Sequence, residues 1–121
     1  MPANTTGREA ETLACNYLQA RGLALVERNY RSRFGEIDLI MHDRDNLIFV
    51  EVRYRRQVRY GSGAESVDAR KQAKLVTCAR HYLLRHPRAA QRPCRFDVVA
   101  INGDETGTDI EWIVDAFPAA Q

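Results

Sequence analysis

The chain has 121 residues, of which 45% are hydrophobic and 28% are charged, and its net charge is +2. We expect one globular domain spanning residues 1–121, with a flexible N-terminus at 1–6 and a tail at 118–121. The small net charge does not by itself indicate a nucleic-acid-binding protein. The three cysteines are far apart and form no C-x-x-C pair, which excludes a disulfide framework and zinc-finger spacing.

The chain contains no apolar run long enough for a signal peptide at its start or for a membrane span further on. Unpaired cysteines also fit a reducing compartment. We therefore expect a cytoplasmic protein without a membrane partner.

The first predicted element is a helix over residues 7–20. Its apolar residues recur at helical spacing and form one stripe, which consists of Ala10, Leu13, Ala14, Tyr17 and Leu18. Glu11 lies at the border of this stripe, and Gly22 is typical of the position just after a helix.

Three strands are predicted next, at residues 23–31, after Gly35, and at 47–54, with a polar turn at 42–46 between the second and the third. Side chains alternate with a period of two along a strand. In the second strand, Glu36, Asp38 and Ile40 should therefore share a face. In the third strand, Glu51 and Arg53 should share a face with the apolar Leu47 and Phe49.

The second half of the chain predicts a polar loop at 57–64, a long amphipathic helix at 66–86, and strands at 93–101 and 110–116. The short links between the first three strands predict antiparallel pairing. The long helix can act as a crossover that makes the third and fourth strands parallel. The sequence thus predicts an α/β fold with a mixed sheet flanked by helices, in the order αβββαββ.

Two carboxylates lie in these strands where apolar residues are usual. A hairpin would bring Asp38 and Glu51 close together, which is costly unless they share a cation or a proton. Mg²⁺ and Mn²⁺ take oxygen ligands, so Asp38, Glu51 and the backbone carbonyl of Val52 are the predicted metal ligands. Such a metal activates water for attack on a phosphate, and Arg53 projects from the same face as Glu51.

Basic residues gather around the predicted site, where they suit a polyanion such as DNA. A solvated, charged strand end is the simpler interpretation of this pattern when the carboxylates are set aside. The candidate DNA-binding residues are Arg31, Arg33, Arg55, Arg56, Arg59, Lys71 and Lys74. For each of the two lysines taken singly, an exposed position on an amphipathic helix explains the residue equally well.

The pattern Asp38, then Glu51-Val52-Arg53, resembles the D…ExK signature of restriction-endonuclease-like nucleases. Longer segments resemble the YraN family of small bacterial proteins, which is placed on that fold. They are Gly7 with Glu11 to Ala14, Arg28-Asn29-Tyr30, Gly35 to Ile40, Phe49 to Val52, Lys71, Arg95-Phe96-Asp97 and Ala116-Phe117. The resemblance spans nearly the whole chain.

The resemblance implies further properties. The arrangement is similar to that of archaeal Holliday-junction resolvases, in which a glutamate of the first helix joins the strand carboxylates, and Glu11 would take that role here. Those resolvases are dimers that act on branched DNA, so a homodimer and branched DNA are implied. The catalytic residues are then Glu11, Asp38, Glu51 and Arg53.

One position departs from the signature, because Arg53 stands where the signature has a lysine. Arginine stays protonated, so Arg53 can bind a phosphate but is a poor base. We therefore keep three hypotheses: a Mg²⁺- or Mn²⁺-dependent DNA endonuclease, a DNA-binding module with weakened or lost cleavage, and a protein-interaction domain with a structural acidic cluster. For Glu36 a salt bridge is favoured over metal binding, and for Asp97 a structural hydrogen bond is expected.

Overall fold

The computed structural model describes residues 7–55, 67–104 and 107–119. The elements follow one another in the predicted order, and the fold is mixed α/β, which confirms the predicted class. They are α1 (Gly7–Ala20), β1 (Ala24–Ser32), β2 (Gly35–His42), β3 (Leu47–Arg55), α2 (Ala69–Arg85), the 3₁₀ turn η2 (Ala89–Gln91), β4 (Cys94–Asp104) and β5 (Gly107–Phe117).

The strands form a single five-stranded sheet in sequence order. The pairs β1–β2, β2–β3 and β4–β5 are antiparallel, and β3–β4 is parallel. The parallel pair is the one that α2 separates along the chain, as expected for a crossover. The predicted pairing of the first four strands is therefore confirmed.

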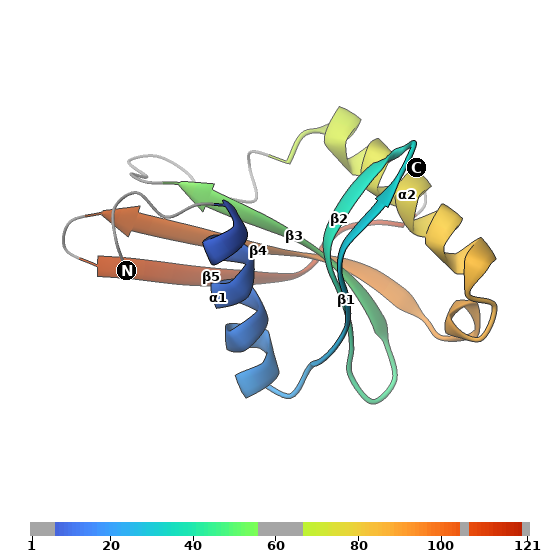
Figure 1. The fold of residues 1–121 in the computed structure, drawn as a ribbon, viewed down its shortest axis with the longest axis horizontal. Coiled ribbons are helices and arrows are strands. Elements are labelled where there is room, and N and C mark those ends of the chain that lie inside the picture. The colour runs from blue at the N-terminus through green and yellow to red at the C-terminus, as the bar shows by residue number, and fades with distance from the viewer. Residues whose placement is uncertain (1–6, 56–66, 105–106, 120–121) are drawn as a thin grey trace.

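The two helices cover opposite faces of the sheet (Figure 1). Ala14 and Leu18 of α1 pack with Leu39, Ile48 and other residues on one face. On the opposite face, α2 packs on a cluster that includes Ile37, Ile40, Leu47, Phe49, Phe96 and Val98. In the described part of the chain, neither helix is long and apolar enough to cross a bilayer.

The β1–β2 hairpin leaves the plane of the other strands near the middle of the sheet (Figure 1). The register between β2 and β3 ends at Leu39 opposite Val50. At this point the predicted alternation of β2 is wrong, because Ile37 and Ile40 both pack on the α2 side while Leu39 packs on the α1 side. The strand leaves β3 here, and the Asp38 side chain accepts a hydrogen bond from the Val52 N–H of β3.

Several element boundaries differ from the predicted ones. The long helix starts at Ala69 instead of residue 66, because the side chain of Asp68 accepts a hydrogen bond from the Lys71 N–H and caps the helix. The last two strands are longer than predicted, because β4 runs to Asp104 and β5 begins at Gly107. The predicted loop at 57–64 lies outside the described residues.

Candidate metal and nucleic-acid site

The structure brings Asp38 and Glu51 together where β2 parts from β3. The Val52 N–H donates to Oδ2 of Asp38 at 2.8 Å, so a carboxylate replaces the ladder partner that β3 has lost. The Glu51 carboxyl group lies close enough to Asp38 to disfavour the charged form of Asp38.

The electrostatic environment of Asp38 disfavours its charged form. Burial first, and then the neighbouring charge of Glu51, raise the pKa of Asp38 to about 8. Glu11 adds a further raising effect, while the hydrogen bond from the Val52 N–H acts in the opposite direction. Glu51 is only 4% exposed, so its charge depends on partners within the protein.

A second pair of carboxylates joins the site through Asn29. The Asn29 side-chain amide donates to Glu11 Oε1 at 2.9 Å and to Glu36 Oε1 at 2.8 Å, and thus links α1 to β2. Asn29 has a φ of 53°, a left-handed conformation that asparagine tolerates better than most residues. Sequence analysis gave Asn29 no site role, and a single asparagine within a charged strand is only a weak signal for one.

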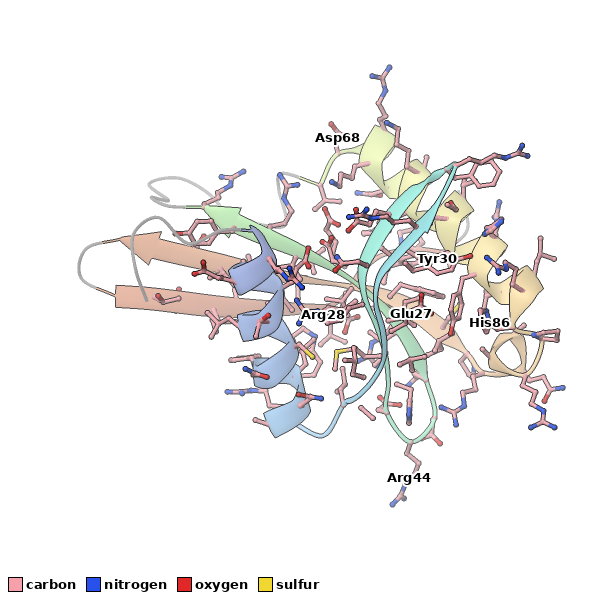
Figure 2. The ribbon with its side chains drawn as sticks, in the orientation of Figure 1. Glu27, Arg28, Tyr30, Arg44, Asp68 and His86 are labelled. Atoms are coloured by element: carbon pink, nitrogen blue, oxygen red, sulfur yellow. The ribbon has the colours of Figure 1, made fainter. Side chains whose placement is uncertain are left out.

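Arginines of β1 flank these two glutamates. The Arg28 side chain reaches from β1 toward α1 (Figure 2), and its Nη2 lies 3.7 Å from Glu11 Oε1. Arg31 Nε lies 3.4 Å from Glu36 Oε2, which confirms the predicted salt bridge of Glu36.

The oxygen atoms of the cluster are close enough for one cation. One oxygen each of Glu11, Glu36 and Asp38 lie within 4.8 Å of one another. A cation with ligands at about 2.1–2.5 Å separates opposite oxygens by about 4.2–5 Å, so the spacing fits. This trio differs from the predicted set of Asp38, Glu51 and the Val52 carbonyl, and Asp38 belongs to both. An all-oxygen donor set suits Mg²⁺, Mn²⁺ or Ca²⁺ rather than zinc.

Two cations approach the same oxygen of Glu51. Lys71 Nζ lies 2.9 Å from Glu51 Oε2, and Arg53 Nη1 lies 3.6 Å from it. The predicted proximity of Arg53 to Glu51 is therefore observed. Lys71 was predicted only as a DNA-binding residue, because a contact between a helix and a distant strand leaves no local pattern in the sequence.

Two hollows open beside the carboxylates and share Glu36 in their linings. One, of about 440 Å³, is lined by Glu11, Asn29 and Glu36 with the cationic Arg8 and Arg31. The other, of about 260 Å³, lies at the start of α2 and is lined by Glu36, Asp68, Arg70, Lys71, Lys74 and Leu75. The predicted DNA-binding residues Arg31, Lys71 and Lys74 thus border the carboxylate cluster.

Of the remaining predicted DNA-binding residues, Arg33 and Arg55 do not line these two hollows. The guanidinium of Arg33 lies over the Phe34 ring, 5.0 Å from its centroid. Arg55 ends β3, about 13 Å along the strand from Glu51. Arg56 and Arg59 lie outside the described residues.

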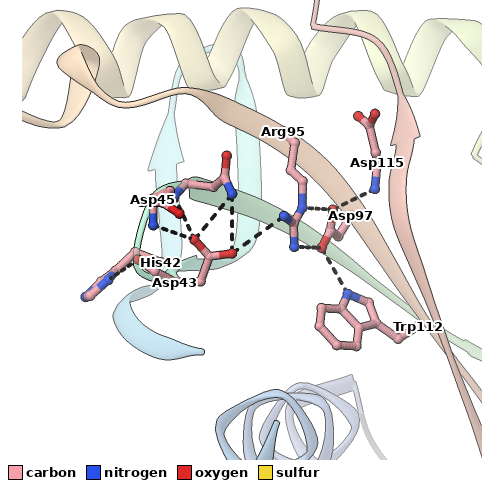
Figure 3. Close-up of polar contacts among 8 residues, drawn as sticks. His42, Asp43, Asp45, Arg95, Asp97, Trp112 and Asp115 are labelled. Atoms are coloured by element: carbon pink, nitrogen blue, oxygen red, sulfur yellow. Dashed lines mark hydrogen bonds and ion pairs between the residues drawn. The ribbon is translucent and has the colours of Figure 1, made fainter. Parts of the chain in front are cut away.

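A different buried carboxylate, Asp97 in β4, has a complete set of partners (Figure 3). Its Oδ1 accepts from Arg95 Nε and the Asp115 N–H, both at 2.9 Å. Its Oδ2 accepts from Trp112 Nε1 at 2.9 Å and Arg95 Nη2 at 3.2 Å. Arg95 also lies 3.6 Å from Asp43 in the β2–β3 turn, so the network joins that turn to β4 and β5. The predicted structural role of Asp97 is confirmed.

Comparison with solved structures gives a weak likeness to SfsA. SfsA from Pyrococcus furiosus, solved in complex with Ca²⁺, matches with a TM-score of 0.41 and 15% sequence identity. The match covers 88% of this chain and 60% of that chain.

Comparison of the sequence gives close relatives over nearly the whole chain. A UPF0102 protein of Nitrosococcus oceani is 55% identical over 111 residues, covering 92% of this chain and 90% of the relative. A UPF0102 protein of Stutzerimonas stutzeri is 50% identical over 115 residues, covering 95% and 96%. The model of the family described as "Uncharacterised protein family UPF0102" matches residues 10–101. The YraN family that the sequence motifs resemble is this family, and the chain belongs to it.

Proposed function

We propose that the protein is a cytoplasmic, metal-dependent DNA endonuclease of the restriction-endonuclease-like class, which hydrolyses phosphodiester bonds. The observation that carries this proposal is the convergence of four carboxylates, Glu11, Glu36, Asp38 and Glu51, at the point where β2 leaves β3. A purely structural acidic cluster explains this poorly, because a carboxyl group whose pKa is raised to about 8 is held at a cost to folding.

The residues that would hold the cation are Asp38 and Glu51, with Glu11 and Glu36 completing the oxygen set. The backbone carbonyl of Val52 remains a predicted further ligand. When bound, a Mg²⁺ or Mn²⁺ ion supplies a water of lowered pKa and neutralises charge on the attacked phosphate. Asn29 orients the two glutamates, and the Val52 N–H orients Asp38.

The charges around the carboxylates support a polyanionic substrate. Arg8 and Arg31 border one side of the cluster, and Arg70, Lys71 and Lys74 border the other. Such contacts bind phosphates without reading base sequence, and they weaken as salt is raised. Branched DNA and a homodimer with two active sites are the finer parts of the proposal, and they rest on the resemblance to junction resolvases.

Arg53 favours a second candidate function, a DNA-binding module with weakened or lost cleavage. Arginine cannot readily give up its proton, so at this position it binds phosphate but does not deprotonate water. In that case the carboxylates would still bind a cation, and the protein would bind DNA without cutting it.

The test is a cleavage assay at low salt with Mn²⁺, using a labelled four-way junction and a linear duplex of the same sequence. Asp38→Asn and Glu51→Gln variants run beside the wild type and reveal contaminating nuclease. Cleavage by the wild type alone supports the nuclease, and the preferred substrate tests the branched-DNA part.

If neither the wild type nor the variants cut but all of them shift the DNA, the second function replaces the first. If the wild type neither cuts nor binds DNA, both proposals fail and a protein partner becomes the remaining hypothesis.

A further inference from the structure

Two cationic side chains approach Glu51 at different distances. Of these two, Lys71 lies within hydrogen-bond distance of Oε2, at 2.9 Å, while the Arg53 guanidinium lies 3.6 Å away. The Lys71 side chain is 45% exposed and that of Glu51 is 5% exposed. The ammonium group therefore spans the border between the buried carboxylate and solvent. It has three N–H donors, so those not used by Glu51 can meet a ligand from the solvent side.

The backbone of Lys71 is held in place at the start of α2. Asp68 caps the helix by accepting from the Lys71 N–H at 2.9 Å, and the Gln72 N–H donates to the Asp68 carbonyl at 2.9 Å. Figure 2 labels Asp68 at this end of the helix. The cap thus fixes the residue whose side chain reaches Glu51, which limits the entropy lost when the contact forms.

Cations are disfavoured at this end of a helix, yet they gather here. Arg70, Lys71 and Lys74 lie within the first two turns of α2, and the first turn has no acidic residue. The helix dipole makes each such cation in the first turn unfavourable by about 0.3–1 kcal/mol and makes an anion favourable. The three cations line the hollow of about 260 Å³ that reaches Glu36 at the edge of the carboxylate cluster. Asp68 and Glu36 also line the hollow and offset part of this charge, and a phosphate would neutralise the rest.

We propose that Lys71 is the cationic catalytic residue of this site and contacts the scissile phosphate beside Glu51. The D…ExK signature gives this place to a lysine of the strand, at the position of Arg53. In this chain α2 would supply the ammonium group, and Arg53 would keep Glu51 in position. This role of Lys71 rests on the proposed nuclease function, and it supplies the lysine that the strand lacks at position 53.

The test compares Lys71→Ala, Arg53→Ala and the double variant Arg53→Lys/Lys71→Ala. Arg80→Ala, which removes an exposed arginine from the same helix, controls for net charge. Two quantities are measured: the single-turnover cleavage rate of junction DNA with Mn²⁺, and the affinity of the DNA-free protein for Mn²⁺ by calorimetry.

We expect Lys71→Ala to cut at least about 100-fold more slowly than the wild type. Its Mn²⁺ affinity should be equal or higher, because the ammonium no longer competes for Glu51. Arg53→Ala should lose less than about 10-fold in rate. The double variant should regain at least about 10-fold over Lys71→Ala, because its strand lysine restores an ammonium group beside Glu51.

Other outcomes overturn the proposal in distinguishable ways. If Lys71→Ala cuts like the wild type, the role of Lys71 fails and the nuclease function stands. If Lys71→Ala loses both cleavage and Mn²⁺ binding, Lys71 is a structural partner of Glu51. If the wild type binds Mn²⁺ but cuts no DNA, the nuclease function and this role of Lys71 fail together.

Discussion

Asp38 and Asp97 are both carboxylates in the central part of the sheet, but they differ in how fully their oxygen atoms are hydrogen-bonded. Asp97 accepts four hydrogen bonds, two on each oxygen, which fill its acceptor sites. Asp38 accepts one backbone N–H, and a second carboxyl group lies beside it. Burial of a charged group is tolerated when its partners are complete, so Asp97 belongs to the structure. The incomplete set around Asp38 is what the proposed metal site requires.

The largest effect on folding should come from Asp97→Asn. An amide cannot accept all four hydrogen bonds, and Arg95 would lose its main carboxylate partner in a half-buried position. We expect the free energy of unfolding, measured in urea, to fall by about 3 kcal/mol. A loss below about 1 kcal/mol would show that the network around Asp97 contributes little, and the contrast with Asp38 would disappear.

The second-largest effect should be a dependence of the free energy of unfolding on pH that comes from Asp38. Because the pKa of Asp38 is raised in the folded state to about 8, the folded protein binds more protons than the unfolded chain above about pH 4. Without metal, the free energy of unfolding should therefore fall as pH rises toward 8, by up to about 1.4 kcal/mol per pH unit relative to Asp38→Asn. Urea unfolding of both proteins in a chelator measures this difference, and parallel pH profiles would contradict it.

The Asn29→Gly variant tests whether the Asn29 side chain holds Glu11 and Glu36 in position for a metal ion. Glycine accepts the positive φ of this position but has no amide to hold Glu11 and Glu36. We expect the Mn²⁺ affinity to fall about 10-fold, as is usual when a residue that orients metal ligands is lost. Unchanged calorimetric affinity in Asn29→Gly would remove Asn29 from the site.

The smallest effect should come from Trp112→Phe. This change removes one donor to Asp97 and keeps most of the ring, so the other three hydrogen bonds remain. We expect a loss of about 1 kcal/mol in the free energy of unfolding, without any change in Mn²⁺ affinity. A change in Mn²⁺ affinity would mean that the Asp97 network also supports the carboxylate cluster.

Local pattern was sufficient to predict most of the fold. The alternation of Leu47 to Tyr54 correctly divided β3 between two cores, because this strand is paired on both sides and stays regular. The same rule failed at Asp38, where β2 loses its partner and the backbone no longer keeps its period. A sequence shows where carboxylates interrupt an apolar strand, but it does not show where the ladder ends.

The proximity of Asp38 and Glu51 followed from the hairpin, whereas the contacts of Asn29 and Lys71 did not. Asn29 contacts Glu11, which is 18 residues away in the sequence, and Lys71 contacts Glu51, which is 20 residues away. Such contacts depend on how the helices pack on the sheet, which no spacing rule encodes. The role of Asp97 was predictable only in outline, because its partners come from β5 as well as β4.

The most direct test of the central claim is the gain in the free energy of unfolding on adding Mn²⁺, measured for the wild type, Asp38→Asn and Asp97→Asn. Binding to the folded state alone adds about 2.7 kcal/mol when free Mn²⁺ is about 100 times the Kd. We predict this gain for the wild type and for the less stable Asp97→Asn, and none for Asp38→Asn. An equal gain in Asp38→Asn would show that these carboxylates are not the metal site.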